Sequence, residues 1–388
     1  MGTTSRSGRS APTRSTPRSP RAPSCGTAFS RSSRIGPTAD DGHAVDTTVD
    51  TSVASGFARR KLLGILSSSW VAQCCYAVAK LGVPDLLADG PRRVDDLAEA
   101  CGADPDALHR LLRGMASIGL FRRTAPQTYA LTSVTECLRS DVPFSLRQMA
   151  VLDGEEVFRS FADILHTMRT GEPAFDMIYG EPFYSYLNGN RGVAATFAEA
   201  MNANQVPTSL PAPDFSDVGT LVDVGGGSGG LLTEVLTAHA GMRGVLLELP
   251  EAVRQARTTL TDAGLAGRAE LVEGSFFDGV PPGGDAYVLA RVLHNWADEK
   301  AQLILRRVRE AMGPESRLVV FEQLLPEEDS DPDAASGMVD LLMLVLLEGH
   351  DRTEEDYRKL LENSGFSLHT VHRGAGPGAD SALVATPV

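Results

Sequence analysis

The sequence predicts an α/β protein with a mostly helical N-terminal domain and a C-terminal domain built on a doubly wound parallel sheet. From Gly219 onward, short apolar segments typical of strands alternate with amphipathic segments typical of helices. This alternation indicates a parallel sheet with helices on its faces. Before residue 145, helical segments precede a small hairpin. A glycine-rich turn follows the first strand of the C-terminal part, and in such sheets this edge is where ligands bind.

The start of the chain has the composition of a disordered tail. Residues 1–55 are rich in Ser, Thr, Arg and Pro and poor in large apolar side chains. They therefore cannot bury enough surface to offset the entropy of ordering. The Arg-rich, acid-poor start also resembles an organellar transit peptide. Translation assigned from a start codon upstream of the real one would look the same, and the three interpretations stay open.

Residues 56–145 are typical of a winged-helix-like domain. A long helix is predicted from Phe57 to Gly82, and because it is apolar on more than one face it must be buried in a core or against a partner chain. Asp104 and Pro105 form an N-cap and first-turn pair that begins a later helix. Two short strands follow it. The same pattern occurs in transcription factors, so a regulator is one alternative.

The charge and the cysteines bound the partners. The net charge is -14, and residues 1–40 hold seven arginines against Asp40 alone, a net +6, which leaves the rest at -20. An acidic body of this kind is a poor partner for nucleic acid. The five cysteines form no CxxC pair and the eight histidines are scattered, which suits the cytoplasm and predicts no metal site. No apolar run reaches the roughly 18 residues of a membrane helix, so we expect no membrane segment.

Residues 146–205 predict a helical linker with breaks at Gly171–Pro173 and Gly180–Pro182. Aromatic stripes at helical spacing are mostly core, but some of these side chains could line a pocket for a flat ligand. The aromatic residues of this segment are Phe175, Tyr179, Phe183, Tyr184, Tyr186 and Phe197.

Residues 206–388 carry the alternating pattern. The predicted strands are 221–224, 245–249, 269–274, 285–294, 317–323 and 381–387. The predicted helices are 231–239, 250–264, 298–312 and 353–365.

The turn after the first of these strands is rich in glycine, which lets the backbone approach a ligand at a helix N-terminus. Gly225, Gly227 and Gly230 also satisfy the GxGxxG pattern of a dinucleotide fold. Glu248, at the end of the next strand, can bind a ribose diol in NAD or in S-adenosylmethionine. An NAD-dependent oxidoreductase is therefore a second alternative.

Three further features favour S-adenosylmethionine. Asp223 precedes the glycines, where an acid can meet the amino group of a methionine moiety. Phe276 follows the third strand, where an aromatic side chain can stack on adenine. The segment His294–Glu299 follows the fourth strand, at the edge where ligands bind.

These residues and their order resemble the large O-methyltransferase family that includes plant caffeate and flavonoid enzymes and bacterial polyketide and antibiotic tailoring enzymes. The resemblance covers roughly residues 57–388 and rests on the segments GEPAFD, LVDVGGGSGGL, GSFFDGVP, RVLHNWADE, FEQLLPE and DRTEE. It implies a Rossmann-like class I methyltransferase domain at 206–388 that binds S-adenosylmethionine. It also implies that residues 56–145 form a dimerisation domain, and that 146–205 contribute to the acceptor pocket of a homodimer.

The resemblance also implies roles for single residues. His294 matches the catalytic base, and Glu322 and Asp351 match acids that flank it. Ser275 stands where many members have an aspartate, so Asp278 could replace that contact. The cofactor-binding positions match Asp223, Gly225, Gly227, Glu248, Ser275, Phe276 and Arg291, and the acceptor-binding positions match Met201 and Asn295.

Each of the three catalytic candidates has a structural alternative. Glu322 could be an exposed strand-end acid, Asp351 could cap the helix that follows it, and His294 could be a packed core histidine.

The hypothesis is methyl transfer from S-adenosylmethionine to the hydroxyl of a small, aromatic natural product, with His294 removing the proton. A winged-helix regulator that binds a small ligand is an alternative that the acidic body disfavours. A family member diverged to another reaction with the same cofactor is a further alternative, which the retained histidine disfavours.

Overall fold

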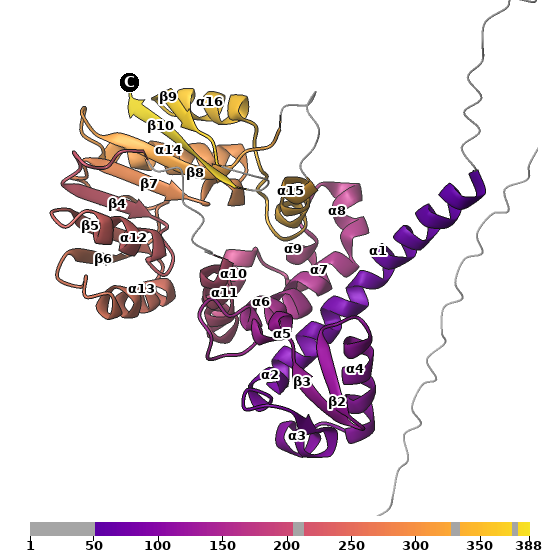
Figure 1. Ribbon diagram of the computed structural model, residues 1–388. Coiled ribbons are helices and arrows are strands. Elements are labelled where there is room, and N and C mark those ends of the chain that lie inside the picture. Colours follow the sequence, from indigo (N-terminus) through magenta and orange to yellow (C-terminus); the bar gives the residue numbers. More distant parts are fainter. Residues whose placement is uncertain (1–50, 205–212, 327–333, 375–378) are drawn as a thin grey trace, which may run out of the picture. The chain divides into compact units, whose positions relative to one another are not determined.

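The computed structural model describes residues 51–204, 213–326, 334–374 and 379–388 (Figure 1). The chain divides into two units, Met1–Ala58 and Arg59–Val388. The predicted disordered tail, 1–55, lies outside the described residues as far as residue 50. Its last five residues begin a helix instead, because α1 spans Thr51–Lys80.

Helix α1, indigo in Figure 1, is apolar on more than one face, as predicted. Its segment Gly56–Lys80 is long and apolar enough to cross a membrane by length and composition, with a mean hydropathy of 1.5 and 11% of the window buried. The expectation that no such stretch exists is therefore wrong, because the interspersed serines and glycines lower the hydropathy too little. The exposed apolar side chains are Phe57, Leu62, Leu63, Ile65, Leu66 and Trp70.

The winged-helix pattern is confirmed, with a small antiparallel sheet of order β1-β3-β2. The side chain of Asp104 accepts a hydrogen bond from the amide of Ala107 at 2.8 Å, which is the predicted N-cap. The elements of this part are α2 (Val83–Leu86), β1 (Arg92–Arg93), α3 (Val94–Cys101), α4 (Pro105–Ser117), β2 (Phe121–Ala125), β3 (Thr128–Leu131) and α5 (Ser133–Glu136).

The next segment is helical, as predicted, and Gly171 and Gly180 end two of its helices in the left-handed conformation. A π-helical turn, η1 (Asp153–Val157), is an addition that the sequence pattern does not signal. The α-helices are α6 (Arg147–Leu152), α7 (Phe158–Ala162), α8 (Ile164–Thr170), α9 (Ala174–Tyr179), α10 (Phe183–Gly189) and α11 (Arg191–Asn204).

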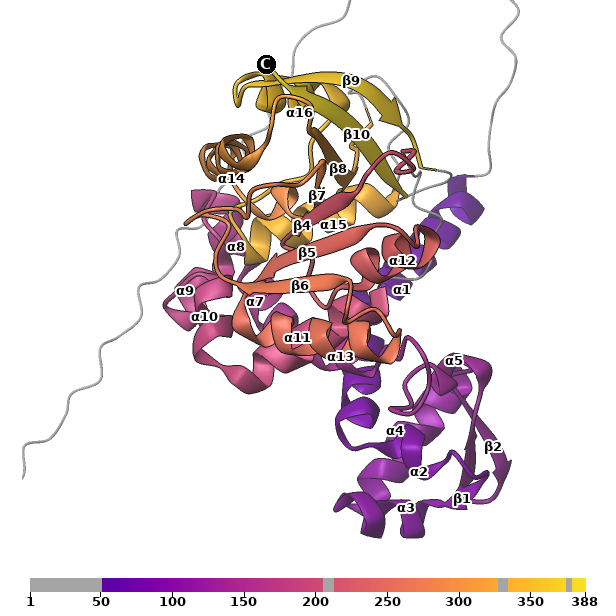
Figure 2. The same cartoon turned by 90° about the vertical axis from the view of Figure 1, so that its left-hand side faces the viewer.

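The C-terminal sheet has seven strands in the order β6-β5-β4-β7-β8-β10-β9 (Figure 2). Five of them are parallel, and β10 runs antiparallel to both of its neighbours. The prediction of a parallel sheet is therefore wrong at this edge, because residues 373–379, which connect β9 to β10, are fewer than the roughly dozen that a parallel crossover needs. The strands are β4 (Thr220–Val224), β5 (Arg243–Glu248), β6 (Ala269–Glu273), β7 (Ala286–Ala290), β8 (Arg317–Gln323), β9 (Phe366–His372) and β10 (Asp380–Pro387).

Helices cover both faces of this sheet, as doubly wound folds require. On β4, Val222 and Val224 belong to the core that α14 (Asp298–Ala311) and α16 (Glu354–Glu362) complete. Leu221, which points to the opposite face, belongs to the core completed by α12 (Gly230–Ala238) and α13 (Pro250–Asp262).

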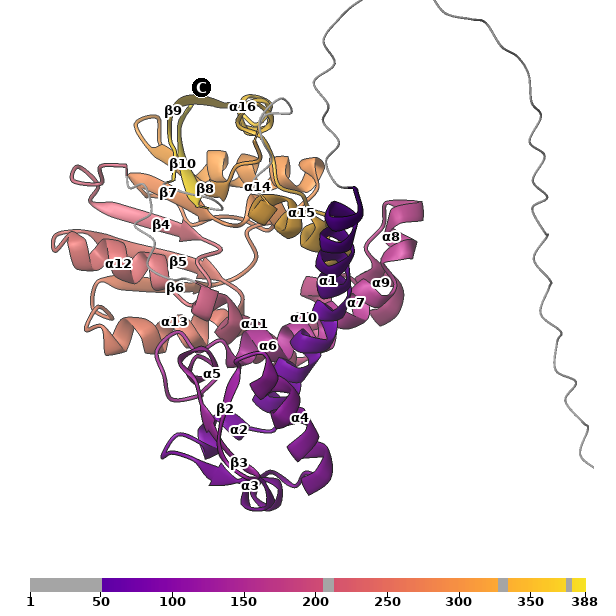
Figure 3. The same cartoon turned by 45° about the vertical axis from the view of Figure 1, so that its right-hand side comes forward.

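Helix α15 (Ala334–Leu346) is the helix of this domain that the sequence pattern does not predict. Val345 and Leu346 pack into the aromatic cluster of the helical segment, with Phe175 and Phe183 at its centre. Figure 1 shows α15 beside α8 and α9, and Figure 3 shows the same helices from a second side, with α1 drawn between α15 and α8. The aromatic residues of 146–205 are therefore mostly core.

Strand β7 ends at Ala290, four residues before the predicted end at 294. Arg291 has a φ of 53°, which a non-glycine residue rarely adopts and which turns the chain out of the sheet. The short 3-10 turn η2 (Leu293–Asn295) follows. His294 consequently lies in a turn beyond the carboxyl end of β7, at the edge where ligands bind in such sheets.

Candidate active site

The glycine-rich turn lies at the carboxyl end of β4 and leads into α12. Gly225 and Gly227 have φ values of 74° and 56°, which favour glycine. A Cβ on Gly225 would lie 3.0 Å from Val292 Cγ2 and 3.4 Å from Phe276 Cε1. A Cβ on Gly226 would overlap the carboxylate of Asp223. Gly225 and Gly227 are therefore needed for conformation, and Gly225 and Gly226 are needed for space.

Asp223, which is buried, and Glu248, which is half-buried, place two carboxylates beside this turn. Among the described residues, neither carboxylate oxygen of Asp223 has a hydrogen-bond partner. Burial, with a smaller contribution from the charge of Glu248, raises the pKa of Asp223 to about 7. Glu248 accepts hydrogen bonds from the amides of Leu249 at 2.6 Å and Gly227 at 3.3 Å. An unpaired buried carboxylate suits a ligand that brings a positive charge.

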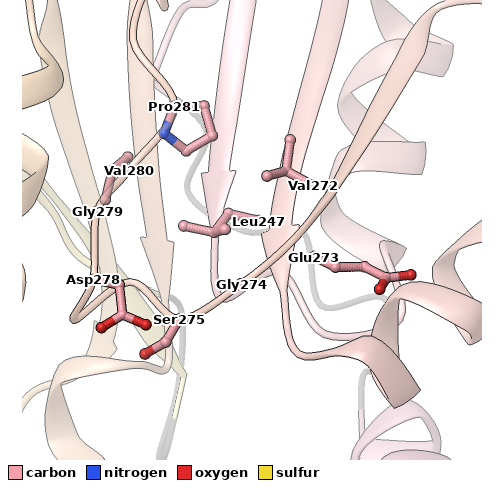
Figure 4. A pocket seen from close by; sticks show the side chains of 9 residues that line it. All are labelled: Leu247, Val272, Glu273, Gly274, Ser275, Asp278, Gly279, Val280 and Pro281. Carbon is pink, nitrogen blue, oxygen red and sulfur yellow. The ribbon is translucent and has the colours of Figure 1, made fainter.

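A pocket of about 420 Å³ lies beyond the carboxyl ends of β5 and β6 (Figure 4). Ser275 and Asp278 lie at one end of it, and Leu247 and Val272 supply apolar lining. The amide of Asp278 donates to the carbonyl of Ser275 at 2.9 Å, which closes the turn that holds both side chains at the pocket. Asp278 therefore stands where it can take the place of an acid at position 275.

His294, Glu322 and Asp351 come together from three separate segments. His294 Nδ1 lies 3.3 Å from Glu322 Oε2 and 3.4 Å from Asp351 Oδ1. Both carboxylate side chains are fully buried, whereas 13% of the histidine side chain is exposed. Glu322 Oε1 also accepts from the amides of Leu293 at 2.8 Å and His294 at 3.3 Å. Glu322 thus fixes both the backbone and the ring of the histidine turn.

Two of the structural alternatives for these residues are wrong. Glu322 is fully buried rather than exposed at the end of β8. Asp351 does not cap α16, because the N-cap is Thr353, whose hydroxyl accepts from the amide of Asp356 at 3.2 Å.

The two acids set the protonation of the histidine. Burial by itself would lower the pKa of His294, but the charges of Glu322 and Asp351 outweigh it, and the pKa is raised above its ordinary value. Arg291 works in the opposite direction. Burial also raises the pKa of Glu322, which the nearby histidine counteracts in part.

Two predicted residues, Arg291 and Asn295, make contacts that the sequence pattern does not reveal. The Nε of Arg291 donates to both oxygens of Asp380 on β10, at 2.9 and 3.1 Å. The amide nitrogen of the Asn295 side chain donates to the carbonyl of Arg291 at 3.1 Å, which closes the histidine turn on itself. Met201 lies partly buried on α11.

Tyr184 and Trp296 lie beside the predicted site residues without being among them, although Trp296 belongs to the RVLHNWADE segment. Their rings stack at 5.3 Å between centroids, and Phe276 meets Trp296 edge-on at 6.2 Å. Burial raises the pKa of Tyr184, and the charges of Glu248 and Glu322 add to the effect. The sequence marks Tyr184 only as one of six aromatic residues, since nothing in its spacing shows which of them face the site.

Within the ranges that the structure describes, no group of three or more His, Cys, Asp or Glu side chains is arranged to hold a metal ion.

Family models match most of the described chain. An O-methyltransferase domain matches residues 158–367, and an O-methyltransferase dimerisation domain matches residues 63–141. The chain belongs to the O-methyltransferase family. It is an S-adenosylmethionine-dependent methyltransferase of the antibiotic and phenazine tailoring type. The alternatives of a winged-helix regulator and an NAD-dependent oxidoreductase are thereby excluded.

Known methyltransferases match over nearly their whole length. The phenazine O-methyltransferase of Lysobacter antibioticus is 38% identical over 80% of this chain and 91% of its own. The 8-amino-8-demethylriboflavin N,N-dimethyltransferase of Streptomyces davaonensis is 39% identical over 78% of this chain and 88% of its own. An O-methyltransferase from neocarzinostatin biosynthesis, solved with S-adenosylmethionine and 2-hydroxy-5-methyl naphthoic acid, has a TM-score of 0.72 at 34% identity over 82% of this chain and 96% of its own. The family thus includes enzymes that methylate oxygen and enzymes that methylate nitrogen.

Proposed function

We propose that this methyltransferase acts on a phenolic hydroxyl of a small aromatic natural product, with His294 as the general base. The observation that carries the proposal is the pair of buried carboxylates at 3.3 and 3.4 Å from His294 Nδ1. Because both acids face Nδ1, they hold the proton on that nitrogen and leave Nε2 free to accept one.

The residues around the glycine turn fit the cofactor. The unpartnered carboxylate of Asp223 suits the ammonium group of a methionine moiety, and Glu248 suits a ribose diol. Gly225 and Gly227 let the backbone come close. When bound, S-adenosylmethionine supplies a methyl group made electrophilic by the neighbouring sulfonium.

The adenine is expected at the pocket beyond β5 and β6. Phe276 would pack on it, and Ser275 and Asp278, which line the pocket, would hydrogen-bond its polar edge. Arg291 is bound to Asp380, so we assign it an electrostatic effect on the neighbouring His294 rather than a direct contact to the cofactor.

The catalytic work of the protein is to position the acceptor and to remove its proton. A phenol has an ordinary pKa near 10, so a histidine whose pKa lies above about 6.5 is a usable base near neutral pH. The imidazolium that forms is stabilised by Glu322 and Asp351. General-base assistance of this kind is worth roughly 10²–10⁴-fold in rate.

The acceptor is expected to be flat and aromatic. The stacked pair Tyr184 and Trp296 offers aromatic surface beside His294. Met201 on α11 is proposed as a further acceptor contact. Asn295 has a structural bond to Arg291, and a contact to the acceptor would be additional. The aromatic compound bound by the neocarzinostatin enzyme supports the same class.

Two properties complete the proposal. The dimerisation domain and the exposed apolar face of α1 support a homodimer. We also propose that the enzyme works in the cytoplasm without a nucleic-acid partner, from the cysteine usage and the acidic body.

Calorimetric titration followed by an acceptor screen tests the proposal. S-adenosylmethionine and its demethylated product S-adenosylhomocysteine are each expected to bind with a micromolar Kd or tighter. The screen compares each phenol with the aniline that carries an amino group in place of the hydroxyl on the same ring. Formation of S-adenosylhomocysteine is the readout. Turnover confined to phenols supports the proposal, whereas turnover confined to anilines would make this an N-methyltransferase.

A further inference from the structure

The turn that carries His294 packs directly against the segment that carries Asp351. A Cβ placed on Gly349 would overlap the carbonyl group of His294 and the backbone of Asn295 and Trp296. The two segments therefore meet backbone to backbone, with no room for a side chain between them. Gly349 has an ordinary φ, so the glycine serves space here rather than conformation.

Arg352 ties the same two segments together from the inside. It is 1% exposed and is the largest fully buried side chain among the described residues. Its Nη1 donates to the carbonyl of Leu293 at 3.1 Å, and its Nη2 to the carbonyl of Trp296 at 2.8 Å. Nε and Nη2 both reach Asp298 Oδ1, at 3.0 and 2.7 Å. The guanidinium thus binds the histidine turn on both sides of His294.

The segment of Arg352 is itself fixed on its other side. The carbonyl of Arg352 accepts from the amide of Leu325 at 3.0 Å, just beyond the end of β8. The amide of Asp351 donates to Asp340 on α15 at 2.9 Å. The arginine therefore connects the histidine turn to a point that is anchored to both β8 and α15.

We propose that Arg352, with Gly349, positions His294 against Asp351. The proposal rests on the proposed function, because the distance between His294 and Asp351 matters for catalysis only if His294 is the general base. Asp351 is adjacent to Arg352 in the chain, so the clamp that holds the turn also sets the contact of 3.4 Å between Asp351 and the ring. Arg352 acts through the backbone carbonyls of Leu293 and Trp296 rather than on a bound ligand.

The physical reason is that the histidine turn is held at its amides by Glu322, a carboxylate that offers no donor to the carbonyls of the turn. The turn begins at Arg291 in a strained conformation, and its inward-facing carbonyls at Leu293 and Trp296 need donors. Arg352 supplies these donors. Without them the turn can relax away from the acid, and the attraction between the ring and Asp351 falls with distance.

Several charged groups face the histidine and decide what a loosened clamp would do. Glu322 approaches from β8 and Asp351 from the loop before α16, and both raise the pKa of His294, while Arg291 lowers it. Asp380 on β10 and Tyr357 on α16 lie near Glu322. Because the clamp governs the distance to Asp351, its loss is expected to lower the pKa of His294.

The experiment compares Arg352→Lys, Gly349→Ala and the matched control Arg268→Lys. Arg268 also donates to three backbone carbonyls, those of Leu236, His239 and Met242, but at the end of α12. The pKa of His294 is measured by NMR on protein with ¹⁵N-labelled histidine, with its signal assigned by its loss in His294→Gln. Affinity for S-adenosylhomocysteine and the pH profile of kcat are measured on the same proteins.

We expect both clamp variants to lower the pKa of His294 and to move the acid limb of the kcat profile to lower pH. Their kcat falls by about 10–100-fold while the affinity for S-adenosylhomocysteine stays within about three-fold. Arg268→Lys is expected to change neither the pKa of His294 nor the acid limb of the pH profile of kcat. An unchanged pKa of His294 in both clamp variants would overturn the proposal.

This outcome is separable from failure of the proposed function. If His294→Gln keeps full turnover, the base assignment fails, but the NMR titration still reports whether Arg352 positions the ring. If His294→Gln is inactive and the clamp variants lose activity without a change in the pKa of His294, Arg352 has a structural role alone.

Discussion

At the scale of single residues, the site consists of two sets of carboxylates with different chemistry around them. Asp223 and Glu248 flank the glycine turn, and Glu322 and Asp351 flank a histidine. The first pair is left without a positive partner among the described residues, whereas the second pair surrounds one. The first pair therefore suits binding of a cationic cofactor, and the second suits holding a proton.

The direction of the pKa shift at His294 predicts a pH profile. The base must be neutral, and its pKa is raised, so kcat rises with pH and levels off only above the ordinary histidine value of about 6.5. Asp351→Asn removes one of the raising charges, and its acid limb is expected at lower pH with a lower plateau. A limb that stays in place or moves to higher pH would contradict this assignment.

Asp223 predicts opposite effects on binding and on stability. Its pKa of about 7 in the folded protein exceeds the unfolded value near 3.9, so it costs stability increasingly as pH rises from about 4 to 7, up to about 4 kcal/mol. Asp223→Asn is expected to melt at a higher temperature than wild type at pH 8, with a smaller difference at pH 5. It should also bind S-adenosylhomocysteine about 10–100-fold more weakly, because a charged hydrogen bond is lost.

The binding measurement and the melting measurement on Asp223→Asn can each contradict a different part of this prediction. Undiminished affinity in Asp223→Asn would remove Asp223 from the cofactor site. A lower melting temperature than wild type at pH 8 would mean that the carboxylate is not an unpaired buried group.

The sequence predicts the candidate catalytic residues where they lie in a motif, but it does not predict the contacts that these residues make. The sequence singles out His294, Glu322 and Asp351, and the structure brings them within 3.4 Å. Nothing in one sequence shows that Arg352 reaches the carbonyls of Leu293 and Trp296, because this needs the relative position of two segments more than fifty residues apart.

At the scale of elements, glycine serves two purposes in the glycine turn, a left-handed backbone conformation and space for close packing. Both Gly225 and Gly227 have a positive φ, but a Cβ would meet Val292 and Phe276 at Gly225 and nothing at Gly227. The open side of Gly227 is where a ligand can approach.

This difference predicts a contrast between two alanine variants. Gly227→Ala is expected to lose about 1 kcal/mol of stability, from its backbone alone, and to weaken S-adenosylhomocysteine binding through its new methyl group. Gly225→Ala adds crowding against Val292 and should lose about 2 kcal/mol or more. Chemical denaturation and calorimetry measure both quantities. Equal losses of stability would contradict the packing seen at Gly225.

The boundaries of elements show where pattern fails. The prediction carries β7 on to residue 294 because Val292 and Leu293 continue its apolar run, yet the backbone turns at Arg291. Helix α15 has apolar side chains on most of its surface, so its periodicity is weak. The antiparallel β10 was predicted as a strand, but strand direction follows from the connection rather than from composition.

At the scale of the whole molecule, the apolar outer surface of α1 needs a partner. Trp70 is 71% exposed and Leu66 is 62% exposed, within a segment that is also apolar enough to cross a membrane. The match of residues 63–141 to a dimerisation domain favours a second copy of this chain as the partner.

The double variant Leu62→Glu with Leu66→Glu tests this surface. We expect sedimentation velocity to show a dimer for the wild type and a weakened dimer or a monomer for the variant, because charges replace apolar area at the interface. Lys61→Glu alters charge at the same place without removing an apolar side chain and serves as the control. A wild-type monomer that binds lipid vesicles would assign α1 to a membrane instead.

The general architecture was predictable because the local sequence signals agree with one another. Alternating strands and helices, the glycine turn at the carboxyl end of β4 and the N-cap at Asp104 all point to the same fold. The identity of the acceptor was not predictable. Which aromatic side chains of the helical segment point towards the acceptor site depends on tertiary packing.

The rate of methyl transfer by His294→Gln decides whether His294 removes the acceptor proton at an S-adenosylmethionine site. His369→Gln, which changes an exposed histidine on β9, is the control. We predict that His294→Gln binds S-adenosylhomocysteine within about three-fold of wild type while kcat falls by roughly 10²–10⁴-fold. Turnover equal to that of wild type, with S-adenosylhomocysteine still bound, would show that His294 is not the general base.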